Sequence, residues 1–247
     1  MMTAIFSGLG LFFWSMGCTE KRILPEAPKQ EIIYDIELQM IWEGEQLQRD
    51  VHWNWEVHLI PQQTFGDDSL GMRLYWETAS FQEGDMDWLE SPLQGKGLNI
   101  RVFTWGELLS VDGLEQLRDI PDAQLLDGAI GAIFPNSPQY KSEIWLQRLQ
   151  VWPYSLPNEP YSKQLIRANW ERSDDHVHYD GEWYGKKGQN RLFEGAAKGD
   201  VWRSSPWIDR HDFQWTRSLL EPYNATQQLR GHIVKRELII EQDGERK

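Results

Sequence analysis

Residues 32–42 read IIYDIELQMIW, and this stretch decides the fold class. Apolar side chains occupy every second position from 32 to 42, with Asp35, Glu37 and Gln39 between them. A period of two places alternate side chains on opposite faces of an extended strand. The stretch therefore predicts a long β-strand with one apolar face and one more polar face.

The same period recurs in both halves of the chain. In residues 51–59, Val, Trp, Trp, Val and Leu alternate with His, Asn, Glu and His, and we expect this strand to end at Pro61. Residues 72–77 and 98–105 predict two further strands. Strand-like composition returns later in the chain, at residues 142–152, 164–171, 177–184, 191–203, 212–219 and 228–241.

Between the two groups of strands the period changes to that of a helix. Asp112 followed by Glu115 resembles a capping box, and the apolar residues at 114, 117 and 120 have helical spacing. A second apolar stripe from residue 125 to 133 lies between Pro121 and Pro135. This order predicts an α+β, mostly β domain, in which one large antiparallel sheet carries a short helical insertion on one face. A sheet of this size curls, so we expect a half-barrel.

The first eighteen residues, MMTAIFSGLGLFFWSMGC, indicate the cellular compartment in which the protein is located. The uncharged run from Ala4 to Trp14 is well short of the roughly 20 residues that span a bilayer, as in a secretory signal peptide. We predict a signal peptide at residues 1–17, a tether that begins with Cys18 and covers residues 18–30, and one domain at 31–243. The other interpretation is a buried apolar N-terminal segment in which Cys18 is an incidental small residue.

Composition excludes some partners and permits a core. The net charge is −13 with no Lys/Arg run, which argues against a nucleic-acid partner because phosphate binding needs clustered positive charge. Hydrophobic residues make up 40% of the chain, enough for a globular core. Cys18 is the only cysteine, so no disulfide forms within the chain.

Cys18 directly follows Gly17 at the end of the apolar run, where it resembles the lipobox of bacterial lipoproteins. The resemblance implies a diacylglycerol cysteine carrying palmitate-like chains, and hence a membrane anchor in the cell envelope. Two acyl chains make a stable anchor, whereas one holds only marginally. Thr19 resembles the residue found there in lipoproteins sorted to the outer membrane, so we expect that membrane.

The strand–helix–strand order resembles the half-barrel lipoproteins of the LolA/LolB and LppX-like group, and also a set of uncharacterised lipoproteins. The latter share a Gly-Glu-Leu-Leu-Ser-Val-Asp-Gly phrase, present at residues 106–113, and a Phe-Pro phrase, present at 133–138. The resemblance implies that the curved sheet binds lipid acyl chains or an envelope protein partner. It implies no cofactor and no catalytic residue.

The sequence has no nucleophile elbow, phosphate loop or paired-cysteine metal motif, so we predict a non-enzymatic protein. His176 and His178 share one strand face near several Asp residues, but as a metal site this pattern is weaker than its interpretation as a solvated hairpin. The alternative function is an envelope glycan hydrolase with two carboxylates in an aromatic cleft.

Three tryptophans at alternating positions, Trp53, Trp55 and Trp76, lie on apolar strand faces. They either line a ligand cleft or fill the core, and both interpretations stay open on the sequence.

Overall fold

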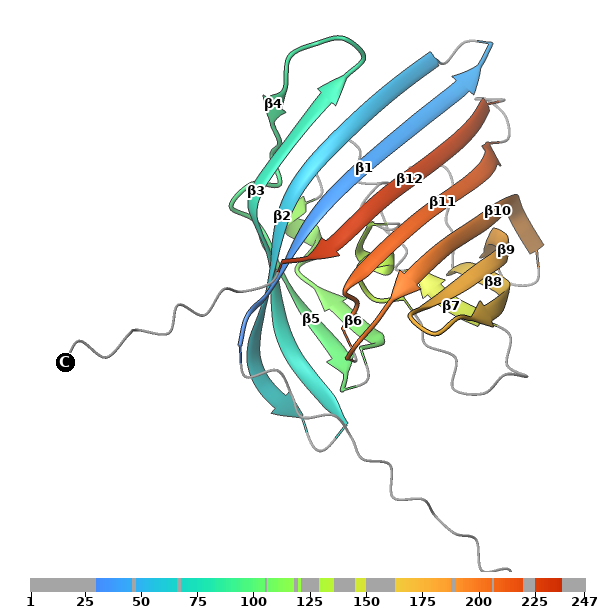
Figure 1. Cartoon of the computed structure of the whole chain (residues 1–247). Coiled ribbons are helices and arrows are strands. Elements are labelled where there is room, and N and C mark those ends of the chain that lie inside the picture. Colours follow the sequence, from blue (N-terminus) through green and yellow to red (C-terminus); the bar gives the residue numbers. More distant parts are fainter. Residues whose placement is uncertain are drawn as a thin grey trace, which may run out of the picture.

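The computed structural model describes residues 30–45, 48–65, 68–104, 106–117, 120, 129–135, 145–149, 163–187, 190–205, 207–219 and 225–236. These residues form one twelve-stranded antiparallel sheet with a small helical portion (Figure 1). The mostly β architecture predicted from the sequence is confirmed.

The strands of the N-terminal half are β1 (Ile32–Gly44), β2 (Gln48–Phe65), β3 (Ser69–Glu83), β4 (Leu89–Glu90), β5 (Gly97–Phe103) and β6 (Leu108–Asp112). Those of the C-terminal half are β7 (Trp145–Leu149), β8 (Lys163–Arg172), β9 (His176–Lys187), β10 (Asn190–Trp202), β11 (Arg210–Leu219) and β12 (Ala225–Lys235). Each predicted strand corresponds to one of these, and β6 lies where the sequence suggested the start of a helix.

The two halves meet in the middle of the sheet. The strand order is β6-β5-β3-β2-β1-β12-β11-β10-β9-β8-β7, with β4 paired to β3. The first and last strands are therefore neighbours, and their register runs from Tyr34 opposite Lys235 to Gly44 opposite Ala225. Because the order ends at β6 and β7, the described sheet is open between these strands, where the helical insertion connects them.

The sheet curls strongly, so that β5 and β6 on one side and β7 to β9 on the other lie behind the central strands (Figure 1). Glycines on the concave side permit this curvature and the close approach of aromatic rings. A Cβ at Gly231 would lie 2.3 Å from the ring of Phe213, and a Cβ at Gly199 would lie 2.7 Å from the Tyr179 hydroxyl. Larger residues at these positions would push the neighbouring rings away.

The concave side, here called the inner face, contains the core. Tyr34, Ile36, Leu38, Met40 and Trp42 of β1 are buried, as the period of two predicted. The described helical residues are a 3-10 turn at Leu114–Leu117 and residues 129–133. Leu117, Ala129, Ile130 and Ile133 belong to the same buried cluster as the strands, so the insertion packs on one face of the sheet as predicted.

Two local predictions need correction. The first helix is only a 3-10 turn, because Gly113 (φ +93°) ends β6 and the turn follows at once. Pro61 does not end β2, which continues to Phe65. The pairing of β2 with β1 ends at Leu59, which lies opposite Ile32. Beyond that point β2 has an unpaired edge, where a proline is tolerated although it lacks a backbone N–H.

Several predictions fall outside the described residues. They concern the signal peptide at residues 1–17, Cys18 and its tether up to residue 29, most of the second predicted helix, and the domain end beyond residue 236. Within the described part of the chain, no helix is both long and apolar enough to cross a membrane.

Candidate functional site

The three tryptophans predicted to line a ligand cleft or the core lie side by side on the inner face of β2 and β3. Trp53 and Trp55 are each 4% exposed and Trp76 is 1% exposed. The rings of Trp55 and Trp76 meet edge to face, with 6.2 Å between centroids. This is the preferred geometry of buried aromatic pairs, and all three rings belong to the buried core cluster of the sheet.

Trp55 and Trp76 share a second property. The indole Nε1 of each is buried and has no hydrogen-bond acceptor among the described residues. A buried donor left without an acceptor costs about 1–3 kcal/mol, and buried indole N–H groups usually have a partner. Each of these two donors is therefore a position where an acceptor oxygen would be stabilised.

Elsewhere on the inner face, a tryptophan N–H has a hydrogen-bond acceptor within a buried series of hydrogen-bonded polar side chains. Trp215 Nε1 donates to the Tyr179 hydroxyl over 3.0 Å, and that hydroxyl lies 3.0 Å from Nε2 of His211. Nδ1 of His211 lies 2.8 Å from the carbonyl oxygen of Ala132 in the helical insertion. A carbonyl only accepts, so Nδ1 carries the proton, Nε2 accepts, and Tyr179 donates to it.

Burial fixes the protonation states of His211 and Tyr179 in this hydrogen-bonded series. Desolvation lowers the pKa of His211 to about 4, against a smaller opposing contribution from the Ala132 carbonyl. Desolvation likewise raises the pKa of Tyr179. Both side chains are therefore neutral near pH 7 and hold the helical insertion against β9 and β11.

A buried arginine lies further along the inner face. Arg217 of β11 is 4% exposed, its Nε donates to Gln227 Oε1 on β12, and its guanidinium lies 4.9 Å from the centroid of the Trp183 ring. The Gln227 amide in turn donates to the sulfur of Met40 over 2.9 Å. Arg217 was not among the residues predicted from the sequence, although residues 213, 215 and 217 lie at alternate positions and therefore on the same strand face as each other.

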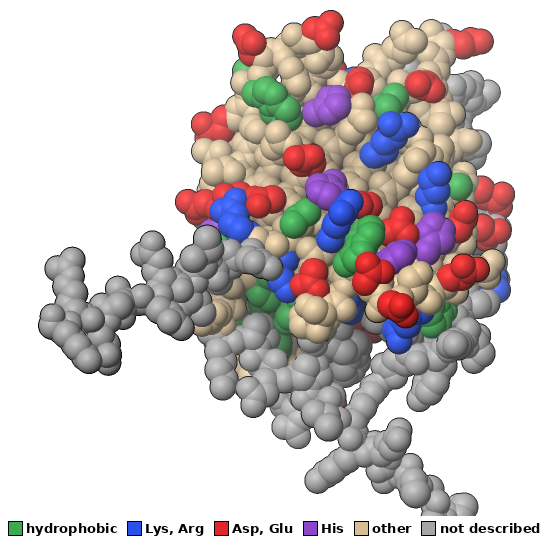
Figure 2. Space-filling model, in the orientation of Figure 1, with side chains coloured by type: hydrophobic (Ala, Val, Ile, Leu, Met, Phe, Trp, Pro, Cys, Tyr) green, Lys and Arg blue, Asp and Glu red, His purple; other side chains and the backbone are tan. Residues whose placement is uncertain are grey.

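The opposite face, here called the outer face, is polar and charged (Figure 2). Five histidines on it each pair with a carboxylate. They are His52 with Asp50, His58 with Glu31 and Glu56, His176 with Asp175, His178 with Asp200, and His232 with Asp212.

The two histidines considered as metal ligands belong to this set. His176 and His178 use their ring nitrogens on Asp175 and Asp200, and His176 also stacks on Trp202 with 5.2 Å between centroids. The described residues contain no group of three or more His, Cys, Asp and Glu side chains suited to a metal ion.

The glycan-hydrolase alternative requires two facing carboxylates, and the described strands contain two such pairs. Asp35 lies opposite Glu56, and Arg236 donates to both of them. The second pair is on β10 and β11. Asp200 of β10 lies directly opposite Asp212 of β11 in the sheet register. A glycosidase needs one carboxyl with a raised pKa as its acid. Desolvation opposes ionisation of Asp212, but hydrogen bonds from Arg210 and His232 outweigh it and lower the pKa of Asp212. The pair lies on the outer face among ion pairs, so its environment is unlike that of a general acid.

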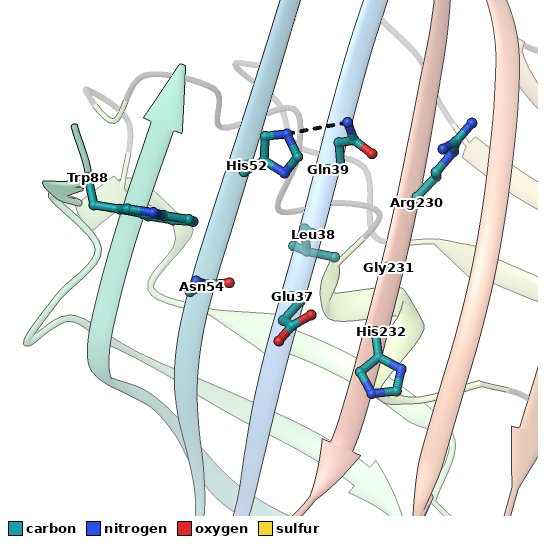
Figure 3. Close-up of a pocket in the computed structure, with 9 residues that line it drawn as sticks. All are labelled: Glu37, Leu38, Gln39, His52, Asn54, Trp88, Arg230, Gly231 and His232. Atoms are coloured by element: carbon teal, nitrogen blue, oxygen red, sulfur yellow. Dashed lines mark hydrogen bonds between the residues drawn. The ribbon is translucent and has the colours of Figure 1, made fainter. Parts of the chain in front are cut away.

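A groove of about 470 Å³ crosses the outer face of β2, β1 and β12 (Figure 3). The sheet register forms it from two rows of neighbouring residues: Asn54, Glu37 and His232 in one row, and His52, Gln39 and Arg230 in the next. Trp88 closes one side. A second hollow of about 280 Å³ shares Glu37 and Asn54 with the first.

Comparison with known proteins gives a structural likeness at low sequence identity. No protein-family model matches the chain, and the search of curated proteins gives no match. Among solved structures, an S-type phycobiliprotein lyase from Guillardia theta is similar over 83% of this chain and 88% of its own, with 6% sequence identity and a TM-score of 0.30.

Proposed function

We propose that this protein is a non-enzymatic lipoprotein of the bacterial cell envelope that binds an apolar ligand on the inner face of its sheet. The observation that carries the proposal is the Trp55–Trp76 pair, with two buried indole donors that lack an acceptor among the described residues. An apolar, aromatic surface with a few convergent polar groups is the usual composition of a small-molecule site.

The donors indicate the chemistry of the ligand. An ester or carboxyl oxygen accepts hydrogen bonds from two N–H groups, while an attached hydrocarbon chain packs on apolar side chains. Trp53 and Ile36 lie beside the pair: Trp53 is two residues from Trp55 on β2, and Ile36 is opposite Trp55 on β1. A lipid with one polar carbonyl group therefore fits this surface better than a pure hydrocarbon.

Anchoring is the second part of the proposal and has its support in the leader. Cys18 would carry the diacylglycerol group, and Thr19 favours sorting to the outer membrane. A carrier held at the membrane by its own lipid would meet membrane-derived ligands at high local concentration.

Ligand binding is tested with the full chain carrying Cys18→Ser, purified without detergent and analysed by native mass spectrometry. We expect a bound mass of lipid size that is lost on denaturation. An apo mass for this protein, unchanged after incubation with oleic acid or with phosphatidylethanolamine vesicles, would contradict the proposal.

The role of the donors is tested with Trp55→Phe and Trp76→Phe, which keep an aromatic ring and remove the N–H. Each is expected to weaken oleate binding about tenfold, the effect of losing roughly one hydrogen bond to a charged group. Trp53→Phe is the matched control on the same face. Equal losses in all three variants would show that ring size, and not the donors, governs binding.

The anchor is tested separately by growth with labelled palmitate. The wild-type chain should incorporate the label and sediment with membranes, whereas Cys18→Ser should do neither. Labelling that persists in the Cys18→Ser variant would refute the lipobox interpretation.

A further inference from the structure

The outer-face groove differs from its surroundings in its unpaired side chains. Most charged groups nearby are paired, as in Asp212 with Arg210 and in Glu56 with Arg236. By contrast, the side chains of Glu37, Asn54 and Arg230 make no hydrogen bond or ion pair within the described ranges, and all three are exposed in the groove. These three residues are called the groove trio below.

Trp88 stands at the side of this groove and is 44% exposed. It extends from the turn between β3 and β4 toward β2 (Figure 3). An indole is costly to expose, so a tryptophan held beside a polar hollow indicates a contact surface.

The turn that carries Trp88 is fixed at both ends. The Gly84 N–H donates to the Asp50 carbonyl of β2 over 2.9 Å, and the Gln82 side chain donates to the Met86 carbonyl over 2.6 Å. After Trp88, β4 pairs with β3 through Leu89 opposite Phe81. The aromatic ring is therefore presented by backbone hydrogen bonds on both sides, a preorganised arrangement.

We propose that this groove is a glycan-binding site, with Trp88 as the stacking platform. A sugar ring has an apolar face of C–H groups, which packs on the negative face of an aromatic ring, and an edge of hydroxyl groups that donate and accept. The groove trio supplies an amide, a carboxylate and a guanidinium, which together offer donors and acceptors to such an edge. Gln39 and His52 extend the same edge along the second row.

Charge and size favour a neutral saccharide. Glu37 and Arg230 carry opposite charges in one groove, so neither a phosphate-rich nor a strongly basic ligand is complemented. The volume of about 470 Å³ is within the range of about 300–1,000 Å³ usual for small-molecule sites. The adjoining hollow of about 280 Å³ continues the groove past Asn54, as an oligosaccharide requires.

Isothermal titration calorimetry of the full chain with two probes, chitotetraose and cellotetraose, tests the proposal. Binding of at least one probe is expected, and Trp88→Ala should weaken it about tenfold or more, as for an aromatic residue at the centre of a contact. Trp88→Phe should retain most of the affinity. No binding of either probe, or binding that Trp88→Ala leaves unchanged, would overturn the proposal.

Met86→Ala is the matched control, since Met86 is 51% exposed in the same turn and does not line the groove. It should bind the probe as the wild type does, and an equal loss in this variant would overturn the specific role of Trp88. Trp55→Phe, on the inner face, should leave glycan binding unchanged. The glycan site and the inner-face ligand site can therefore fail independently.

Discussion

Nδ1 of His211 on β11 lies 2.8 Å from the carbonyl oxygen of Ala132, 79 residues earlier in the chain. This hydrogen bond joins the helical insertion to the inner face of the sheet, and Nδ1 can donate it in both charge states, whereas Nε2 accepts from the Tyr179 hydroxyl only while the imidazole is neutral. Protonation of Nε2 would break the Tyr179 hydrogen bond and place a charge in the core, so the stability of this region depends on pH.

We predict an acid sensitivity that comes from His211. Its pKa in the folded protein is about 4, against 6.5 for an unperturbed histidine. The neutral form is favoured in the fold, so its stabilisation is complete above pH 6.5 and is lost as pH falls toward 4, by about 3 kcal/mol in total. Urea unfolding of wild type and His211→Asn between pH 7 and 4.5 measures the difference. Parallel pH dependences in the two proteins would contradict the prediction.

His58 should behave in the opposite way. Burial opposes its protonation, but hydrogen bonds with Glu56 and Glu31 outweigh burial and raise the pKa of His58. Its contribution to stability is complete below pH 6.5 and is lost as pH rises through the raised value. Glu31→Gln should lower the pKa of His58, measured by NMR titration of the imidazole. Glu43→Gln, an exposed change on β1, is the control and should leave that pKa unchanged.

Curvature of the sheet should depend on Gly231. A Cβ there would lie 2.3 Å from the Phe213 ring, so Gly231→Ala is expected to cost about 1–3 kcal/mol of unfolding free energy. Thr226→Ala, an exposed change on β12, should change stability by less than about 0.5 kcal/mol. Adding Phe213→Leu to Gly231→Ala should recover part of the loss, and failure to do so would show that the ring is not what the methyl group meets.

The buried Arg217 should make Gln227 important for stability. Gln227→Leu removes the acceptor of the Arg217 Nε hydrogen bond while leaving the guanidinium buried, which should cost about 2 kcal/mol or more. Gln228→Leu changes the next residue, which is on the outer face, and serves as the control. Chemical denaturation of both variants compares the two, and equal effects would contradict the assigned role.

The sequence predicted the sheet well because the period of two is a local property. The alternation of odd and even positions alone places Trp53 and Trp55 on one face and Asn54 on the other. The same alternation, applied to charged residues, would also have placed Arg217 and His211 on the inner face. An odd or even residue number predicts the face of the sheet on which a side chain lies, but it does not predict which side chains of other strands lie beside it.

Neighbours depend on register, which the sequence did not reveal. Asp200 lies opposite Asp212, and Glu37 opposite His232, only because of how distant strands pair. Irregularities add to this: the register shifts between Glu56 and Val57, next to the tryptophan pair whose donors lack acceptors. Trp88 lies in a turn without any period, so no pattern distinguished it from a residue of the core.

The pairing of β1 with β12 has a consequence for how the molecule is made. Until residue 235 is available, β1 has only β2 as a partner, and half of its backbone groups stay unpaired at an exposed edge. The centre of the finished sheet is therefore the last part that a growing chain can close. Contacts so distant in sequence form slowly, which leaves the nascent protein with an open strand edge for other chains to pair with.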